Sequence, residues 1–128
     1  MNTQRLDAVE AAVRAATTLA EQSVDVRVDH ETAKHMSFAP VRDDEFDQAD
    51  LVITFGGDGT LIRAAHLCSK RGTLILGVYY GRFGFVTQCL GSELGSCLSA
   101  FFDGNAIVEP RMMLQTELIR HGQVIATF

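Results

Sequence analysis

The sequence predicts an α/β fold in which helices flank a parallel β-sheet. Two nearly continuous apolar runs, residues 51–55 and 73–79, are typical of strands that are buried on both faces of a parallel sheet. Segments with apolar residues at three- and four-residue steps lie before, between and after these runs, and such spacing predicts helices. A chain of 128 residues with 47% hydrophobic residues is the size of one domain and has ample material for a core.

The first predicted element is an amphipathic helix over about residues 3–22. Its apolar positions recur at helical spacing: Leu6, Val9, Val13, Ala16 and Ala20. Residues 24–28 alternate apolar and polar side chains and predict a strand, and residues 30–50 predict a polar loop with room for a short helical turn. Because an alternating α/β domain usually opens on a strand, we expect a first strand to be missing before the helix.

The central element is a strand, a tight turn and a helix. The apolar run that ends at Phe55 is followed by Gly56-Gly57-Asp58-Gly59-Thr60, and then by apolar residues at helical spacing from Leu61 to Cys68, with Thr60 expected as the N-cap. Ligands of open parallel sheets bind at the carboxyl ends of strands, where this turn lies. The glycines allow positive φ angles and the close approach of a ligand.

The turn predicts phosphate chemistry. The free N–H groups that open a helix favour an anion such as a phosphate. Asp58 cannot bind that phosphate directly, because two negative charges about 4 Å apart repel by roughly 4 kcal/mol at intermediate dielectric. The carboxylate needs either Mg²⁺ between the charges or a hydroxyl group to accept from. A carboxylate that holds a hydroxyl beside a phosphate-binding turn is the minimum apparatus for phosphoryl transfer. The structural alternative is a turn aspartate that binds its own backbone.

The C-terminal part predicts a helix and then a hairpin. The helix covers about residues 92–102 and is stopped by Asp103-Gly104. Residues 112–120 and 123–128 are expected to pair around the turn His121-Gly122. Because an isolated hairpin is marginal in water, we expect an α/β domain over 1–110 and the start of a truncated antiparallel β domain over 111–128. Both ends therefore indicate a piece of a larger protein; the alternative is a natural short protein.

The composition argues against several classes of partner. The net charge of −5 and the lack of a basic cluster argue against nucleic acid and membrane surfaces. No apolar run reaches about 18 residues, and no secretory signal opens the chain. Three cysteines without CxxC spacing indicate reduced thiols in a cytoplasmic protein, used as small apolar fillers. The acidic group at residues 43–50 is interpreted as a solvated loop, and no metal site is predicted in the chain.

Two motifs carry a family resemblance. Gly56-Gly57-Asp58-Gly59-Thr60, followed by Arg63, and Gly77-Val78-Tyr79-Tyr80-Gly81-Arg82-Phe83-Gly84-Phe85 resemble the N-terminal half of the NAD kinases. The first motif is shared with diacylglycerol and sphingosine kinases, whereas the second, at this distance, points to NAD kinase. The resemblance implies a Rossmann-like α/β domain that phosphorylates the 2′-hydroxyl of the adenosine ribose of NAD to give NADP. Similar enzymes use ATP or inorganic polyphosphate with a divalent cation such as Mg²⁺, and form homodimers or tetramers.

The resemblance also implies site residues. Asp58 would accept the proton of the ribose 2′-hydroxyl, and Phe85 would line the adenosine site, whereas Phe83 is expected in the core. The expected nucleotide-binding set is Gly56, Gly57, Asp58, Gly59, Thr60, Arg63 and Phe85. The plain alternatives are a solvated helix residue for Arg63 and a core residue for Phe85. Gly81 and Gly84 would serve the loop, and Tyr79 departs from the asparagine that is commonest in the family.

Part of the active site is expected to lie outside this chain. In the family, a second, antiparallel β domain supplies an asparagine–glutamate pair, so the 128-residue chain is expected to be an inactive fragment. One rival is a lipid kinase of the diacylglycerol type, and another is a non-catalytic nucleotide-binding domain. A dehydrogenase is disfavoured because the third glycine of GxGxxG is absent and an acid lies where the pyrophosphate would bind.

Overall fold

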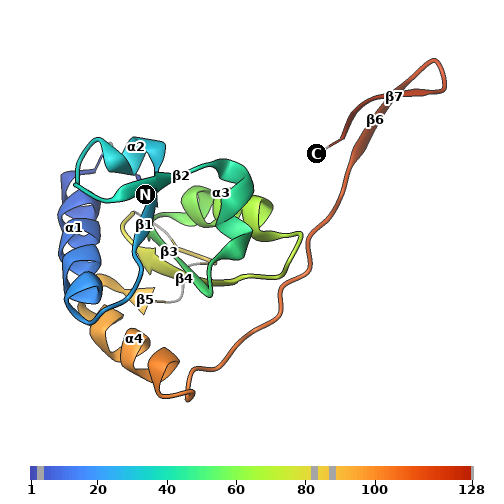
Figure 1. Ribbon diagram of the computed structural model, residues 1–128. Helices are drawn as coiled ribbons and strands as arrows, with labels where there is room; N and C mark the ends of the chain where they lie inside the picture. Colours follow the sequence, from blue (N-terminus) through green and yellow to red (C-terminus); the bar gives the residue numbers. More distant parts are fainter. Residues whose placement is uncertain (3–4, 82–83, 87–88, 128) are drawn as a thin grey trace.

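The computed structural model describes residues 1–2, 5–81, 84–86 and 89–127 (Figure 1). Its helices are α1 (Leu6–Glu21), α2 (His30–Ala33), α3 (Asp58–Cys68) and α4 (Leu94–Phe102), with 3₁₀ helices η1 (Asp43–Gln48) and η2 (Gly91–Glu93). Its strands are β1 (Arg27–Asp29), β2 (Ala39–Val41), β3 (Leu51–Gly56), β4 (Leu74–Tyr79), β5 (Cys89–Leu90), β6 (Glu117–Arg120) and β7 (Gln123–Thr127). Among these residues, no helix combines the length and apolar character needed to cross a bilayer.

The central sheet is parallel, as predicted. Its strand order is β3-β4-β5, and β3 pairs with β4 along its whole length, from Leu51 opposite Leu74 to Gly56 opposite Tyr79. β1 and β2 form a separate two-stranded parallel ladder, so the described strands do not make the single sheet that was predicted. Because Gly56 and Tyr79 are paired, the loops that follow β3 and β4 leave the same edge of the sheet side by side.

Helices cover both faces of this sheet. On one face, Phe55 and Val78 pack against Ala8, Ala11 and Ala12 of α1. On the other face, Val52 packs against Ala64 and Cys68 of α3, with Phe46 and Ile75 at the margin. Residues that alternate along β3 therefore serve opposite layers, which explains why the strand is apolar at consecutive positions.

The segment before β3 contains more structure than the predicted polar loop. The strand expected over residues 24–28 is observed only at Arg27–Asp29, and it pairs with β2 inside the expected loop. Asp29 starts α2 by accepting hydrogen bonds from the N–H groups of Glu31, at 3.0 Å, and Thr32, at 2.9 Å. Elements of three or four residues are too short for periodicity to reveal. The expected polar loop therefore contains an unpredicted strand, β2, whereas the short helical turn for which it had room is present as α2 and η1.

The N-terminus of α3 differs from the prediction. The N-cap is Gly57 and the helix begins at Asp58, so Thr60 lies in the first turn, where its N–H donates to the carbonyl of Gly57 at 3.0 Å. The described glycines with positive φ are Gly72, Gly104 and Gly122, so the turn at residues 56–59 does not need a left-handed backbone. Gly56 is needed for space, because a Cβ there would collide with the Thr60 hydroxyl.

The hairpin forms around the predicted turn. His121 (φ 50°) and Gly122 (φ 77°) join β6 and β7, and positive φ at both turn residues is the type I′ pattern that matches strand twist. The first strand begins at Glu117, not at residue 112. Figure 1 shows the hairpin standing clear of the α/β part at the end of an extended segment. Its large apolar side chains in the described strands are exposed: Leu118 at 50%, Ile119 at 59%, Val124 at 52% and Ile125 at 51%.

The first residues lie beside β3. The N–H of Asn2 donates to the carbonyl of Phe55 at 2.8 Å, on the edge of β3 that does not face β4. The ammonium group of Met1 lies 3.3 Å from Oδ2 of Asp29 and so joins the start of the chain to the start of α2. The expected missing strand stays a prediction.

Candidate functional site

The candidate site is the sheet edge where β3 and β4 end, formed by residues 56–60 and 84–86 and called the edge site below. Residues 56–60 are the turn from β3 into α3, and residues 84–86 belong to the connection from β4 to β5. The pairing of β3 with β4 sets both segments at the same edge. The carboxyl edge of a parallel sheet is where open α/β folds bind ligands.

Asp58 is held by the second segment of the edge site. The N–H of Phe85 donates to Oδ2 of Asp58 at 2.9 Å, and the N–H of Val86 donates to Oδ1 at 3.1 Å. A hydrogen bond to a charged group contributes about 1.5–3 kcal/mol. These two donors lie 27 and 28 residues along the chain, so the carboxylate is not simply a turn aspartate that binds its own local backbone. The half-buried carboxylate is thereby fixed in direction.

Sequence reasoning singled out Asp58 and Phe85 but missed Val86 and the contact between the segments. One signal was available. Two consecutive parallel strands end in glycine-containing segments, and such segments meet at one edge if the strands are neighbours. Strand order is not visible in the sequence, so the contact could not be derived from it.

Phe85 presents its ring to solvent. The residue is 88% exposed while its own N–H holds Asp58, so the interpretation of Phe85 as a core residue is wrong. An exposed aromatic ring beside a fixed carboxylate can stack on a planar ligand. Phe83, expected in the core, lies outside the described residues.

Arg63 lies apart from this carboxylate. Its guanidinium is 4.0 Å from Oδ2 of Asp43 in η1, and both side chains are mostly exposed. Five residues along a helix correspond to a rotation of about 140°, so Arg63 and Asp58 leave α3 in different directions. Other carboxylates of the acidic segment also pair with arginines: Asp44 with Arg42 at 2.8 Å, and Asp47 with Arg71 at 3.7 Å.

The glycines of the turn leave the backbone accessible. A Cβ built on Gly57 or Gly59 would meet no described atom within 4 Å, so among the described residues these two positions border open space. Thr60 packs over Gly56 and closes the other side of the turn. The edge site is therefore an open surface on the described residues.

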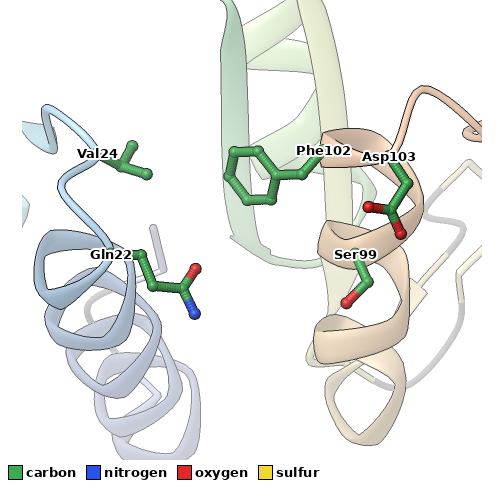
Figure 2. Close-up of a pocket in the computed structure, with 5 residues that line it drawn as sticks. All are labelled: Gln22, Val24, Ser99, Phe102 and Asp103. Atoms are coloured by element: carbon green, nitrogen blue, oxygen red, sulfur yellow. The ribbon is translucent and has the colours of Figure 1, made fainter.

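Two cavities between α1 and α4 lie away from residues 56–60. One of about 380 Å³ lies between the end of α1 and α4, where Gln22 and Val24 face Ser99, Phe102 and Asp103 (Figure 2). An adjoining one lies along the same two helices, and residues 56–60 line neither. Within the described ranges, no group of three or more histidine, cysteine or acidic side chains is placed to hold a metal ion.

Comparison with known sequences gives the family. The profile of the ATP-NAD kinase N-terminal domain matches residues 1–106, which include both segments of the edge site. The chain belongs to the NAD kinase family. The predicted resemblance is thus confirmed.

The NAD kinase family contains several relatives of similar identity. The NAD kinase of Heliobacterium modesticaldum is 34% identical over 124 residues, covering 95% of this chain and 44% of that protein. The NAD kinase of Geotalea daltonii is 43% identical over 100 residues, covering 77% and 35%. The NAD kinase of Natranaerobius thermophilus is 32% identical over 130 residues, covering 99% and 46%. The chain therefore spans less than half the length of these curated relatives.

Proposed function

We propose that this chain is the nucleotide-binding α/β part of an NAD kinase. The enzyme would transfer the terminal phosphoryl group of ATP, or of inorganic polyphosphate, to the 2′-hydroxyl of the adenosine ribose of NAD and so form NADP. The observation that carries this proposal is the fixed carboxylate of Asp58, which lies at the N-terminus of α3 and receives the N–H groups of Phe85 and Val86.

In this proposal Asp58 receives the hydroxyl of the acceptor. The carboxylate accepts a hydrogen bond from the 2′-hydroxyl and takes its proton as the phosphoryl group arrives. Because the transition state of phosphoryl transfer is loose, the correct placement of the hydroxyl matters more than the basicity of its acceptor. The amide groups of Phe85 and Val86 supply that placement, since they hold both carboxylate oxygens.

The rest of the edge site supplies binding groups. The N-terminus of the 11-residue helix α3 favours phosphate oxygens, and Gly57 and Gly59 let them approach the backbone. The exposed ring of Phe85 would stack on adenine. Arg63 would reach the nucleotide only after leaving Asp43, and Thr60 would contact it beside Gly56.

A divalent cation fits this arrangement in one way. Mg²⁺ is commonly bound by one or two carboxylates together with substrate phosphates and water, so Asp58 and the phosphates of the bound nucleotides would hold it. The ion would reduce the repulsion between carboxylate and phosphate.

The open surface of the edge site supports a further part of the proposal. We propose that residues 111–128 begin an antiparallel β domain that completes the site, and that the intact enzyme is a homo-oligomer. The exposed apolar residues of the hairpin support such a domain, because they need cover. The 128-residue chain alone would then bind nucleotides weakly and show no kinase activity.

The test is a kinetic assay of the complete gene product with NAD, ATP and Mg²⁺. Asp58→Asn should lower the turnover for NADP formation by about 10²–10⁴-fold while the fold is retained. Asp25→Asn is the matched control, because Asp25 is exposed and forms an ion pair with its near neighbour Arg27, away from the edge site, and its turnover should stay at the wild-type value. Near-normal turnover of Asp58→Asn would remove Asp58 from the reaction.

The same assay separates the rival functions. Phosphorylation of a diacylglycerol instead of NAD would favour the lipid kinase, and nucleotide binding without turnover would favour the non-catalytic domain.

A further inference from the structure

Two cysteine thiols meet where β5 contacts α4. Cys89 opens β5 and Cys97 lies in α4, and their Sγ atoms are 2.9 Å apart. The thiol of Cys97 donates to Sγ of Cys89, whose own thiol donates to the carbonyl of Leu90 at 3.3 Å. A disulfide has an S–S distance of about 2.0 Å, so the two sulfur atoms need to approach by only about 1 Å to bond.

We propose that Cys89 and Cys97 are a modification site, a dithiol that a low-molecular-weight disulfide such as glutathione disulfide oxidises to an intramolecular disulfide. This proposal goes beyond the proposed kinase function and does not depend on it. It also revises the interpretation of these two cysteines as simple apolar fillers, because the structure shows them in contact through their sulfur atoms.

The two thiols have different surroundings and therefore different roles. Cys89 is 1% exposed, whereas Cys97 is partly exposed. Burial raises the pKa of Cys89 to about 12, helped by the hydrogen bond from Cys97 and by the charges of Cys97 and Glu93. The attacking species in disulfide exchange is the thiolate, and access to the reagent is required. Cys97 is therefore the thiol that meets the reagent, and Cys89 is the one that resolves the intermediate.

The exchange occurs in two balanced steps. The Cys97 thiolate, after losing its proton to water, attacks one sulfur of glutathione disulfide; a mixed disulfide forms and one glutathione thiolate leaves. Cys89 then gives up its proton and attacks Sγ of Cys97, which displaces the second glutathione thiolate. The two cysteines lose two electrons and two protons, and the glutathione disulfide becomes two molecules of glutathione.

The third cysteine serves as an internal control. Cys68, the last residue of α3, is 2% exposed and packs with Ala64 against Val52, on the other face of the sheet from α1. Burial first, and the charge of Asp47 second, raise the pKa of its thiol. A buried thiol with a raised pKa reacts slowly with disulfides, so Cys68 should stay reduced in the folded chain.

The disulfide would act on the edge site through the chain. Cys89 follows Val86 by three residues, and Val86 holds Asp58. A bond between Cys89 and Cys97 would tie the start of β5 to α4, and so fix the far end of the connection that carries Phe85 and Val86. We therefore expect the surroundings of the Phe85 and Val86 amide groups to change when the disulfide forms.

The test uses the purified 128-residue chain in buffers of defined glutathione to glutathione disulfide ratio. In the oxidising buffer, the wild-type chain should lose two of its three thiols and two hydrogens in mass, and peptide mapping should join residues 89 and 97. Cys68→Ser should behave in the same way. Cys89→Ser should instead accumulate a glutathione adduct on Cys97, and Cys97→Ser should retain its thiols.

Amide nitrogen–proton NMR spectra give a second measurement. The signals of Phe85 and Val86 should shift on oxidation of the wild-type chain and stay in place in oxidised Cys97→Ser. Three intact thiols in the wild-type chain under fully oxidising conditions, or a stable glutathione adduct on its Cys97, would overturn the proposal. Both of those results come from the wild-type chain, so they hold even if a cysteine variant fails to fold. Unshifted signals of Phe85 and Val86 would overturn the link to the edge site.

Discussion

The N–H of Val86 donates a hydrogen bond of 3.1 Å to Oδ1 of Asp58, although the two residues are 28 positions apart in the chain. Phe85 holds the other carboxylate oxygen in the same way. The direction of the acid thus depends on a segment that belongs to the neighbouring strand. Any change that separates the ends of β3 and β4 should therefore disturb the carboxylate even if Asp58 itself is intact.

Replacement of Val86 by proline tests this dependence. Val86→Pro removes the N–H that holds Oδ1 of Asp58, and a lost hydrogen bond to a charged group costs about 1.5–3 kcal/mol. If Asp58 acts in the proposed reaction, kcat of the complete gene product should fall about 10-fold or more, since 1.36 kcal/mol corresponds to a factor of ten. Val86→Ala keeps the N–H and should retain kcat. Equal kcat values for the two variants would show that this hydrogen bond has no part in turnover.

Replacement of Gly59 by alanine should change the stability of the chain and its binding of nucleotide in opposite directions. Gly59 lies in the first turn of α3 with negative φ, and a Cβ there would meet no atom of the described part of the chain within 4 Å. Gly59→Ala should therefore stabilise the chain by about 0.4–1 kcal/mol in urea unfolding, because the unfolded chain loses freedom. The same methyl group would stand where the proposed phosphate approaches the backbone, so KM for NAD or ATP should rise in the complete gene product. A stabilised variant with unchanged KM would place the nucleotide elsewhere.

Gly56 should respond in the opposite way. A Cβ at Gly56 would collide with the Thr60 hydroxyl, and the Cβ of Thr60 itself would lie only 3.0 Å away. Gly56→Ala should destabilise the chain by about 1–3 kcal/mol through overpacking, measured by the same urea unfolding. The double variant Gly56→Ala with Thr60→Ala should recover part of that loss, because the second change removes the hydroxyl. No recovery would contradict the steric explanation.

Thr54 offers a stabilising substitution. It is 5% exposed in β3, and within the described part of the chain its hydroxyl has no hydrogen-bond partner. An unsatisfied buried hydroxyl costs about 1–3 kcal/mol, so Thr54→Val should raise the free energy of unfolding by about 1 kcal/mol.

A second buried threonine supplies the control for that change. Thr32 is equally buried, but its hydroxyl donates to Oδ2 of Asp29, so Thr32→Val should destabilise the chain. Urea unfolding of both variants measures the contrast. A destabilised Thr54→Val would reveal a partner for its hydroxyl.

Asp29 should give the chain part of its acid sensitivity. Burial alone would raise the pKa of Asp29, but hydrogen bonds from the hydroxyl and N–H of Thr32 and the ammonium group of Met1 outweigh burial and lower it from 3.8. The unfolded chain therefore binds this proton more readily, so the stabilisation is complete above about pH 4 and is lost as pH falls through the lowered pKa.

The matched variant is Asp29→Asn, because asparagine is also a good N-cap and so isolates the charge. Its free energy of unfolding should fall less steeply as pH drops below about 4 than that of the wild-type chain, and at pH 7 it should be less stable than the wild-type chain, because the charge that the lowered pKa favours is missing. Urea unfolding over a pH series makes the comparison. Parallel pH profiles would show that Asp29 is not the group responsible.

Local patterns predicted much of this fold correctly. The apolar runs predicted β3 and β4, and helical spacing predicted α1 and α4 close to their observed bounds. The turn at His121-Gly122 followed from residues that tolerate positive φ. In each case the deciding interactions lie within a few residues, so the sequence contains the whole signal.

The short elements were predicted less well, for the converse reason. β1 was expected over residues 24–28 and is observed at Arg27–Asp29, whereas β2 and β5, of three and two residues, were not predicted; each of these strands exists because a neighbouring strand lies beside it. Gly57, and not Thr60, is the N-cap of α3, because Thr60 packs on Gly56 in the first turn. These outcomes depend on packing between segments, which a local pattern does not record.

By itself, the sequence determined the α/β class, the family and the identity of the acid in the turn, because composition, periodicity and motif spacing are properties of contiguous residues. Only the tertiary structure decided that Phe85 and Val86 hold Asp58, that the Phe85 ring faces solvent, and that Cys89 meets Cys97. The physical reason is that these features depend on which segments lie side by side. The pairing of β3, β4 and β5 and the packing of α4 decide this, and the distance between the segments along the chain does not.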